Sequence, residues 1–199
     1  CEASGVDLIF HPEPKEMYHP DFSSFVDMHG LTESLCGKSR PAHFRGVCTV
    51  VTKLFNIVQP DCAYFGQKDA QQLAVIQQMV RDLNLDVTVI GCPIIREADG
   101  LAKSSRNSYL SADERKAALV LSQALEVAKQ LLANGEQNAA KIRNAISETI
   151  QAEPLAKVDY VELVDARTLQ QVDSVERPVL VALAVYIGKT RLIDNFITE

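Results

Sequence analysis

Between residues 43 and 95 the sequence alternates twice between a helical and a strand pattern. Apolar residues recur at helical spacing over 43–59, and a second helix with one apolar face follows from Asp69. A short apolar run at 62–65 lies between them, and a β-branched run at 87–95 comes after. Strands that alternate with helices pair in parallel through right-handed crossovers. The sequence therefore predicts an α/β fold built on a parallel sheet.

After residue 95 the pattern changes from alternating elements to helices followed by strands. Ser111 and Glu114 form a capping-box signature for a helix that should run to about 134. A second helix is expected at 138–151, and strands are expected at 158–164, 179–187 and 191–196, the last two joined by a hairpin. This order predicts an α+β domain with an antiparallel sheet. We place the boundary at 94/95, which gives domains 1–94 and 95–199.

The first 42 residues are harder to interpret. Residues 6–10 have the pattern of a buried strand, whereas 11–42 are rich in proline and glycine and predict an irregular segment. A chain that opens on such a strand, at Cys1, is expected to be a fragment of a longer protein.

Composition excludes several classes of protein. The net charge of −6 weighs against nucleic-acid binding, although a few local cations suffice for a small anionic ligand. The sequence has neither a run of about 18 apolar residues nor a signal-peptide pattern, so we expect no membrane partner. Five widely spaced cysteines without a Cys-x-x-Cys pair indicate reduced, mostly buried thiols in the cytoplasm. The four histidines lack metal-ligand spacing, and no metal-binding residues are assigned.

A first candidate site lies where the 62–65 strand ends and the next helix begins. In open α/β sheets, ligands bind at the carboxyl ends of the strands. Gly66 admits a ligand close to the backbone, Lys68 suits a phosphate, and the helix amino end favours an anion. Gln72 follows one turn later and can face the same crevice. A plain turn with a solvated lysine and Asp69 as helix cap explains the same spacing, and such turns are common.

A second candidate site lies in the polar segment 99–110. Lys103, Ser104, Ser105 and Arg106 place two cations and two hydroxyls in four consecutive residues, a donor set that suits a polyphosphate. An exposed polar loop before a capped helix explains this composition equally well. A third candidate, residues 39–46, offers two arginines and His43 at a helix amino end, but surface charge is the slightly favoured interpretation there. No Walker loop, dinucleotide fingerprint or Gly-x-Ser-x-Gly is present.

Three long motifs occur in order along the chain. They are Arg40-Pro-Ala-His-Phe-Arg-Gly-Val through Val58-Gln-Pro-Asp61, Phe65-Gly-Gln-Lys-Asp-Ala-Gln-Gln-Leu73, and Arg96-Glu-Ala-Asp-Gly-Leu-Ala-Lys-Ser-Ser-Arg-Asn-Ser-Tyr-Leu110. With the ending Arg191-Leu-Ile-Asp-Asn195, they closely resemble the pantoate–β-alanine ligase (pantothenate synthetase) family over essentially the whole chain.

The resemblance implies a Rossmann-like nucleotide-binding domain and a two-step ligation. ATP and pantoate give an enzyme-bound pantoyl adenylate and pyrophosphate, and β-alanine then attacks the acyl carbon to give pantothenate and AMP. Mg2+ assists by neutralising phosphate charge. A cytoplasmic homodimer that binds these small molecules, and neither nucleic acid nor membrane, is also implied.

The same resemblance implies roles for individual residues. In the first site, Gly66 and Asp69 contact the ribose, Gln67 lies in the same ATP-binding turn, Lys68 contacts a phosphate and Gln72 binds pantoate. The backbone at Ile95 recognises adenine, and the loop of Lys103, Ser104, Ser105 and Arg106 closes over the triphosphate. Lys68 and Arg106 are the residues expected to act in catalysis.

The chain departs from the family pattern in two places. The family often has an apolar residue at the position of Lys103. Its leading segment, with the motif Met-Gly-Ala-Leu-His-x-Gly-His, is not in this sequence, so the family's catalytic histidine is not assigned here. We therefore expect the chain alone to be inactive. A non-catalytic nucleotide-binding fragment and another adenylate-forming nucleotidyltransferase are the alternatives.

Overall fold

A computed structural model describes residues 1–198. The expected alternation is present as α3 (His43–Val58), β1 (Cys62–Gly66), α4 (Ala70–Asp82) and β2 (Thr88–Cys92). Strands β1 and β2 pair in parallel, with Cys62 opposite Thr88. The apolar faces of α3 and α4 pack on this sheet and form one core cluster that includes Phe44, Val75 and Ile76. The prediction of a parallel α/β fold is confirmed.

The second half of the chain forms an antiparallel sheet with helices on one side. The elements are α5 (Ala112–Ala117), α6 (Val120–Ala133), α7 (Ala139–Gln151), β3 (Ala156–Asp165), β4 (Val179–Ile187) and β5 (Thr190–Ile197). The strand order is β3-β4-β5, and the capping box between Ser111 and Glu114 is present. The single helix predicted from the capping box to about residue 134 is divided into α5 and α6, because the chain turns at residues 118–119.

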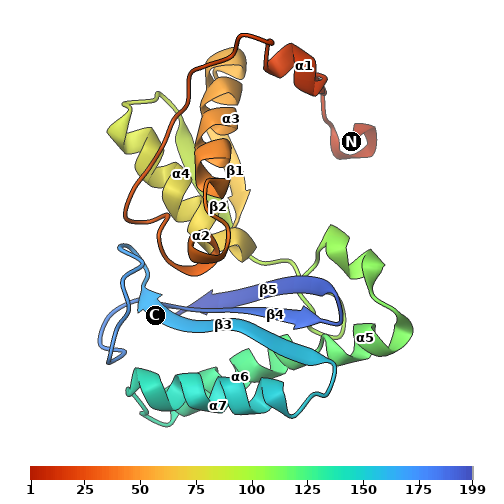
Figure 1. Ribbon diagram of the computed structural model, residues 1–199, viewed down its shortest axis with the longest axis vertical. Coiled ribbons are helices and arrows are strands. Elements are labelled where there is room, and N and C mark those ends of the chain that lie inside the picture. The colour runs from red at the N-terminus through yellow and green to blue at the C-terminus, as the bar shows by residue number, and fades with distance from the viewer. Residues whose placement is uncertain (199) are drawn as a thin grey trace.

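Strand β4 lies in the middle of the molecule. Helices α6 and α7 cover one face of its sheet, and the parallel-sheet part with α2 (Leu35–Ser39) lies against the other face (Figure 1). Side chains from β4 therefore enter two cores: Val181 and Leu183 pack with α6 and α7, whereas Leu180 and Ala182 pack near Leu35. Contact on both faces explains why this strand is almost continuously apolar. It also brings β4 and β5 next to the start of α4.

The amino-terminal segment differs from its prediction. Residues 6–10 are not a strand, and Leu8 and Ile9 are exposed. A strand requires a hydrogen-bonding neighbour, and none pairs with this segment within residues 1–198. The segment 11–42 is largely irregular, as expected, with short helices α1 (Pro14–Met17) and α2.

Three further features bear on the sequence-based expectations. The cysteines are free thiols, but only Cys48 is buried, so the expectation of mostly buried thiols is wrong. None of the helices within residues 1–198 is long and apolar enough to cross a membrane. The predicted boundary at 94/95 falls just after β2, and the division into two domains there remains a prediction.

Candidate active site

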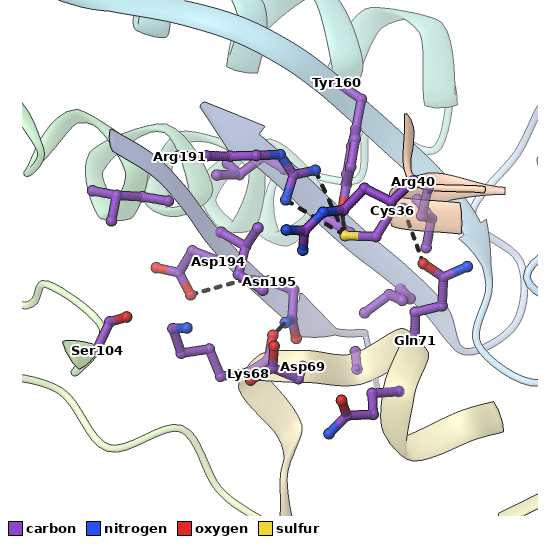
Figure 2. A pocket seen from close by; sticks show the side chains of 18 of the residues that line it. Cys36, Arg40, Lys68, Asp69, Gln71, Ser104, Tyr160, Arg191, Asp194 and Asn195 are labelled. Carbon is purple, nitrogen blue, oxygen red and sulfur yellow. Dashed lines mark hydrogen bonds between the residues drawn. The ribbon is translucent and has the colours of Figure 1, made fainter. Parts of the chain in front are cut away.

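A cavity of about 210 Å3 opens where the parallel-sheet part meets the antiparallel sheet. Four segments line it: residues 35–44, the turn and helix start at 68–72, the loop containing Ser104 and Arg106, and strands β3 to β5. Figure 2 shows Lys68 and Asp69 extending from their turn, Ser104 on a separate loop, and Arg191, Asp194 and Asn195 along β5. The two candidate sites, which are more than 30 residues apart in sequence, therefore share one cavity.

The first candidate site is a short 3-10 turn, η2 (Gln67–Asp69), between β1 and α4. Lys68, Asp69 and Gln72 line the cavity, whereas Gly66 and Gln67 do not. No protein atom lies within 4 Å of where a Cβ on Gly66 would stand, so a ligand has room beside its backbone. The capping role considered for Asp69 is not found, because its side chain makes no capping hydrogen bond.

The second candidate site only partly reaches the cavity. Ser104 and Arg106 line it, but Lys103 and Ser105 do not. Ser104 caps the short helix η3 (Ser105–Tyr109), and its Oγ accepts a hydrogen bond from the backbone N–H of Arg106 at 3.2 Å. Ile95, expected to present its backbone to adenine, lies outside the cavity; its side chain is exposed and its carbonyl accepts from the Lys103 N–H at 2.9 Å.

Unpaired positive charge distinguishes this cavity. Arg40, Lys68 and Arg106 line it, and none of them forms an ion pair within residues 1–198. Asp69 is the one lining carboxylate that is also without an ion-pair partner in that range; Asp194, the other, is paired with Arg96. A local surplus of cations in a chain of net charge −6 is the signature of a site for an anion.

Part of the third candidate site also lies at the cavity, although its charged residues are exposed, as the interpretation as surface charge expects. Arg40 and His43 line it, whereas Arg45 stacks over the Phe25 ring at 3.9 Å. Burial and the nearby Arg40 guanidinium lower the pKa of His43, although Asp69 opposes them. His43 is therefore predominantly neutral at pH 7 and can accept as well as donate a hydrogen bond.

Two neighbouring glutamines on α4 have different environments. Gln71 is 5% exposed, and its side chain bonds the backbone of Leu31, Ser34 and Cys36 at 2.8–2.9 Å, which fastens the 31–36 segment to α4. Gln72 lines the cavity and its amide makes no hydrogen bond within residues 1–198. Gln71 is thus committed to structure, and Gln72 is available to a ligand.

Sequence reasoning from the residues missed the group formed by Cys36, Tyr160 and Arg191. The Cys36 sulfur lies 3.3 Å from the Tyr160 hydroxyl and accepts from Arg191 at 3.6 and 3.7 Å. Arg191 also donates two hydrogen bonds to Asp159, and although burial opposes it, these bonds raise the pKa of Arg191. This wall of the cavity is hydrogen-bonded, and Asp159 neutralises the charge of Arg191. Only the resemblance of residues 191–195 to the family ending pointed to this strand.

A buried ion pair fixes the base of the 96–106 loop. Arg96 donates to both carboxylate oxygens of Asp194 at 2.7 and 2.9 Å and to the Gly100 carbonyl at 3.0 Å. Asp194 is 1% exposed, and the ion pair with Arg96 offsets the cost of burying its carboxylate. The pair ties the loop that carries Ser104 and Arg106 to strand β5.

The described residues do not form a Mg2+ site of their own. Within residues 1–198, no group of three carboxylate, histidine or cysteine side chains is placed to hold a metal ion. Mg2+ that is bound mainly through substrate phosphates needs few protein ligands, so its use remains an expectation from the resemblance.

Solved structures first define the class to which this fold belongs. The structure is similar to that of pantothenate synthetase from Thermus thermophilus, with a TM-score of 0.94 and 43% identity over 98% of this chain and 71% of that one. It is also similar to a Francisella tularensis pantoate–β-alanine ligase, with a TM-score of 0.73 and 32% identity over 98% of this chain and 66% of that one. The latter structure is described as a complex with β-γ ATP and β-alanine.

Sequence comparison then gives the family. The profile of the Pantoate-beta-alanine ligase family matches residues 1–197. Pantothenate synthetase of Clostridium acetobutylicum is 62% identical over 98% of this chain, and that of Enterococcus faecalis is 61% identical over 100% of it. The chain spans about 70% of the length of these two relatives. It belongs to the pantoate–β-alanine ligase family.

Proposed function

We propose that this protein joins pantoate to β-alanine at the expense of ATP, through a pantoyl-adenylate intermediate. In the first step a pantoate carboxylate oxygen attacks the α-phosphorus of ATP, and the bond from that phosphorus to the bridging oxygen breaks to release pyrophosphate. In the second step the amine of β-alanine attacks the acyl carbon, AMP leaves, and the amine loses a proton. No covalent bond to the enzyme is needed.

The observation that carries this proposal is the set of unpaired cations around one cavity. Lys68 and Arg106 come from different segments and have no carboxylate partner within residues 1–198, so a polyphosphate between them would neutralise both. Negative charge grows on the departing pyrophosphate, and fixed cations stabilise that charge without reorganisation. Ser104, on the same loop as Arg106, adds a hydroxyl-bearing side chain to the cavity lining.

The remaining expected contacts form part of the proposal. Gly66 and Asp69 would face the ribose, Gln67 would lie in the same ATP-binding turn, and the backbone at Ile95 would face adenine. Lys103 and Ser105 do not line the cavity. For them to contact ATP, the loop at residues 103–106 would have to move toward the nucleotide. A cytoplasmic location, a homodimer and the division into domains 1–94 and 95–199 are proposed from the family resemblance in the same way.

Product analysis tests the reaction. An active preparation of the enzyme, supplied with ATP, Mg2+, pantoate and β-alanine, should form pantothenate, AMP and pyrophosphate in equal amounts. With pantoate labelled by 18O in its carboxylate, one label should appear in the phosphate of AMP, because that oxygen bridges the two groups in the adenylate. Formation of ADP and phosphate would contradict the proposed intermediate.

Gln72→Ala should impair pantoate use more than ATP use. The Gln72 amide faces the cavity without a hydrogen-bond partner within residues 1–198, which suits the hydroxyl and carboxylate groups of pantoate. Losing one such bond should cost about 1 kcal/mol or somewhat more, a rise in KM for pantoate of about 5- to 10-fold. The control is Gln78→Ala, on the same helix but bonded only to Asp82 and Arg81 at the surface. Equal rises in KM for both substrates would contradict the assignment of Gln72.

The 199 residues alone should turn over far more slowly than a full-length relative. They align with about 70% of the relatives' length, and the described parallel sheet has two strands, with Tyr64 of β1 exposed. Catalysis by positioning loses much of its roughly 7–11 kcal/mol when one wall of the site is not in place. The measurement is pantothenate formation by this chain and by the Enterococcus faecalis enzyme at equal concentration. Comparable rates would show that these residues are sufficient for the reaction.

A further inference from the structure

Asn195 connects the antiparallel sheet to the turn that carries Lys68. Its side-chain N–H groups donate to the backbone carbonyls of Gln67 at 3.1 Å and Lys68 at 2.8 Å. These carbonyls lie 127 and 128 residues away in the sequence, and Figure 2 shows the amide reaching down from β5 to the turn. A primary amide has two N–H donors, so this contact uses both.

The environment of Asn195 makes this contact specific. The residue is 5% exposed, so its amide cannot exchange freely with solvent. Its own backbone N–H is held by the Asp194 carboxylate at 2.8 Å, which fixes the strand from which the side chain projects. Asp194 is fixed in turn by Arg96. Two adjacent residues of β5 therefore hold the two loops that bring Lys68 and Ser104 to the cavity.

By contrast, the Lys68 ammonium group itself is not held by another side chain within residues 1–198. No ion pair or side-chain hydrogen bond restrains it within residues 1–198, so its position depends on where its backbone is held. Lysine is a flexible point charge, and its value to a reaction depends on the distance to the developing charge.

We propose that Asn195 is a positioning residue for Lys68: it holds the Gln67–Lys68 backbone at a set distance from β5 and so places the ammonium in the phosphate site. This inference rests on the proposed function, in which Lys68 stabilises the departing pyrophosphate. Asn195 lines the cavity, but its side-chain N–H groups are bonded to the turn and are not free for a ligand. Its effect on the first step is transmitted through the position of Lys68.

Asn195→Asp is the sharpest test, because it keeps the shape of the side chain and replaces both N–H donors by an acceptor. The measurement is the rate of pantoate-dependent exchange of labelled pyrophosphate into ATP. A displacement of about 1 Å can cost about 100-fold, so we expect a loss of about 10- to 100-fold. Asn144→Asp, the same change at an exposed site on α7, should leave the rate unchanged.

A double-mutant cycle separates positioning from a general structural role. In a Lys68→Ala background, Asn195→Asp should change the exchange rate by less than about twofold, because the group that it positions is gone. Asn195→Ala removes the donors without adding a charge, should behave in the same way, and replaces the Asp variant if that variant does not fold. A full 10- to 100-fold loss in the Lys68→Ala background, or a normal rate for the single variants, would overturn the inference. Absence of pantoate-dependent exchange in an unaltered preparation that does form pantothenate would instead overturn the proposed adenylate step.

Discussion

In an active preparation of the enzyme, Lys68→Ala should reduce adenylate formation by roughly 100- to 1000-fold, equivalent to about 3–4 kcal/mol of transition-state stabilisation. Lys68 extends from the η2 turn into the cavity and has no carboxylate partner within residues 1–198. Its charge is therefore available to the phosphates of the substrate, and removing it leaves the departing pyrophosphate less neutralised. The rate of pantoate-dependent pyrophosphate exchange measures the loss.

Two variants make this result interpretable. Lys68→Arg keeps the charge but changes its shape and reach, so it should recover only part of the rate. Lys116→Ala removes an exposed lysine that does not line the cavity, and it should leave the rate unchanged. A near-normal exchange rate for Lys68→Ala, at an unchanged melting temperature, would remove Lys68 from the proposed site.

Arg96→Ala should lower the free energy of unfolding by about 3 kcal/mol. Breaking a buried ion pair typically costs about 3–5 kcal/mol because it leaves one charge uncompensated. Asp194 is 1% exposed and would lose both hydrogen bonds from Arg96. The Arg96 side chain is 30% exposed, so water can reach part of the gap and the loss should lie at the lower end of that range. Urea unfolding of the two proteins gives the difference.

The control for Arg96→Ala is a second change at its partner. Asp194→Asn in the Arg96→Ala background removes the uncompensated charge and should recover a large part of the lost free energy. Lys141→Ala, which breaks an ion pair between a largely exposed lysine and the half-buried Glu136, should have a much smaller effect. If Arg96→Ala lowered the free energy of unfolding no more than Lys141→Ala, the Arg96–Asp194 pair could not be what fixes the base of the 96–106 loop.

Local sequence pattern was sufficient for most of the fold. The helical repeat of α3 and the β-branched run around β2 are properties of neighbouring residues, and hence their structures could be predicted without knowing the tertiary contacts. Two expectations were wrong at positions where tertiary contacts determine the local structure. Residues 6–10 have a strand pattern but no strand beside them within residues 1–198, and the chain turns between α5 and α6 where the apolar repeat continues.

The site was only partly predictable for the same reason. Lys68 and Gln72, which line the cavity, could be proposed from the sequence because a strand-to-helix junction is a local feature with a known preference for ligands. The contacts of Arg191 with Cys36 and of Asn195 with Lys68 join residues more than 120 positions apart, and no periodicity encodes them. Their existence depends on how the sheet packs against α2 and the start of α4.

The most direct test of the central claim, that this cavity activates pantoate as an adenylate, is exchange of labelled pyrophosphate into ATP in the absence of β-alanine. The first step is reversible and needs only ATP, Mg2+ and pantoate, so label should enter ATP when pantoate is present and should not enter when pantoate is replaced by an amino acid. Gln72→Ala should raise the pantoate concentration needed for half-maximal exchange. Exchange that requires β-alanine, or that proceeds without pantoate, would contradict the account.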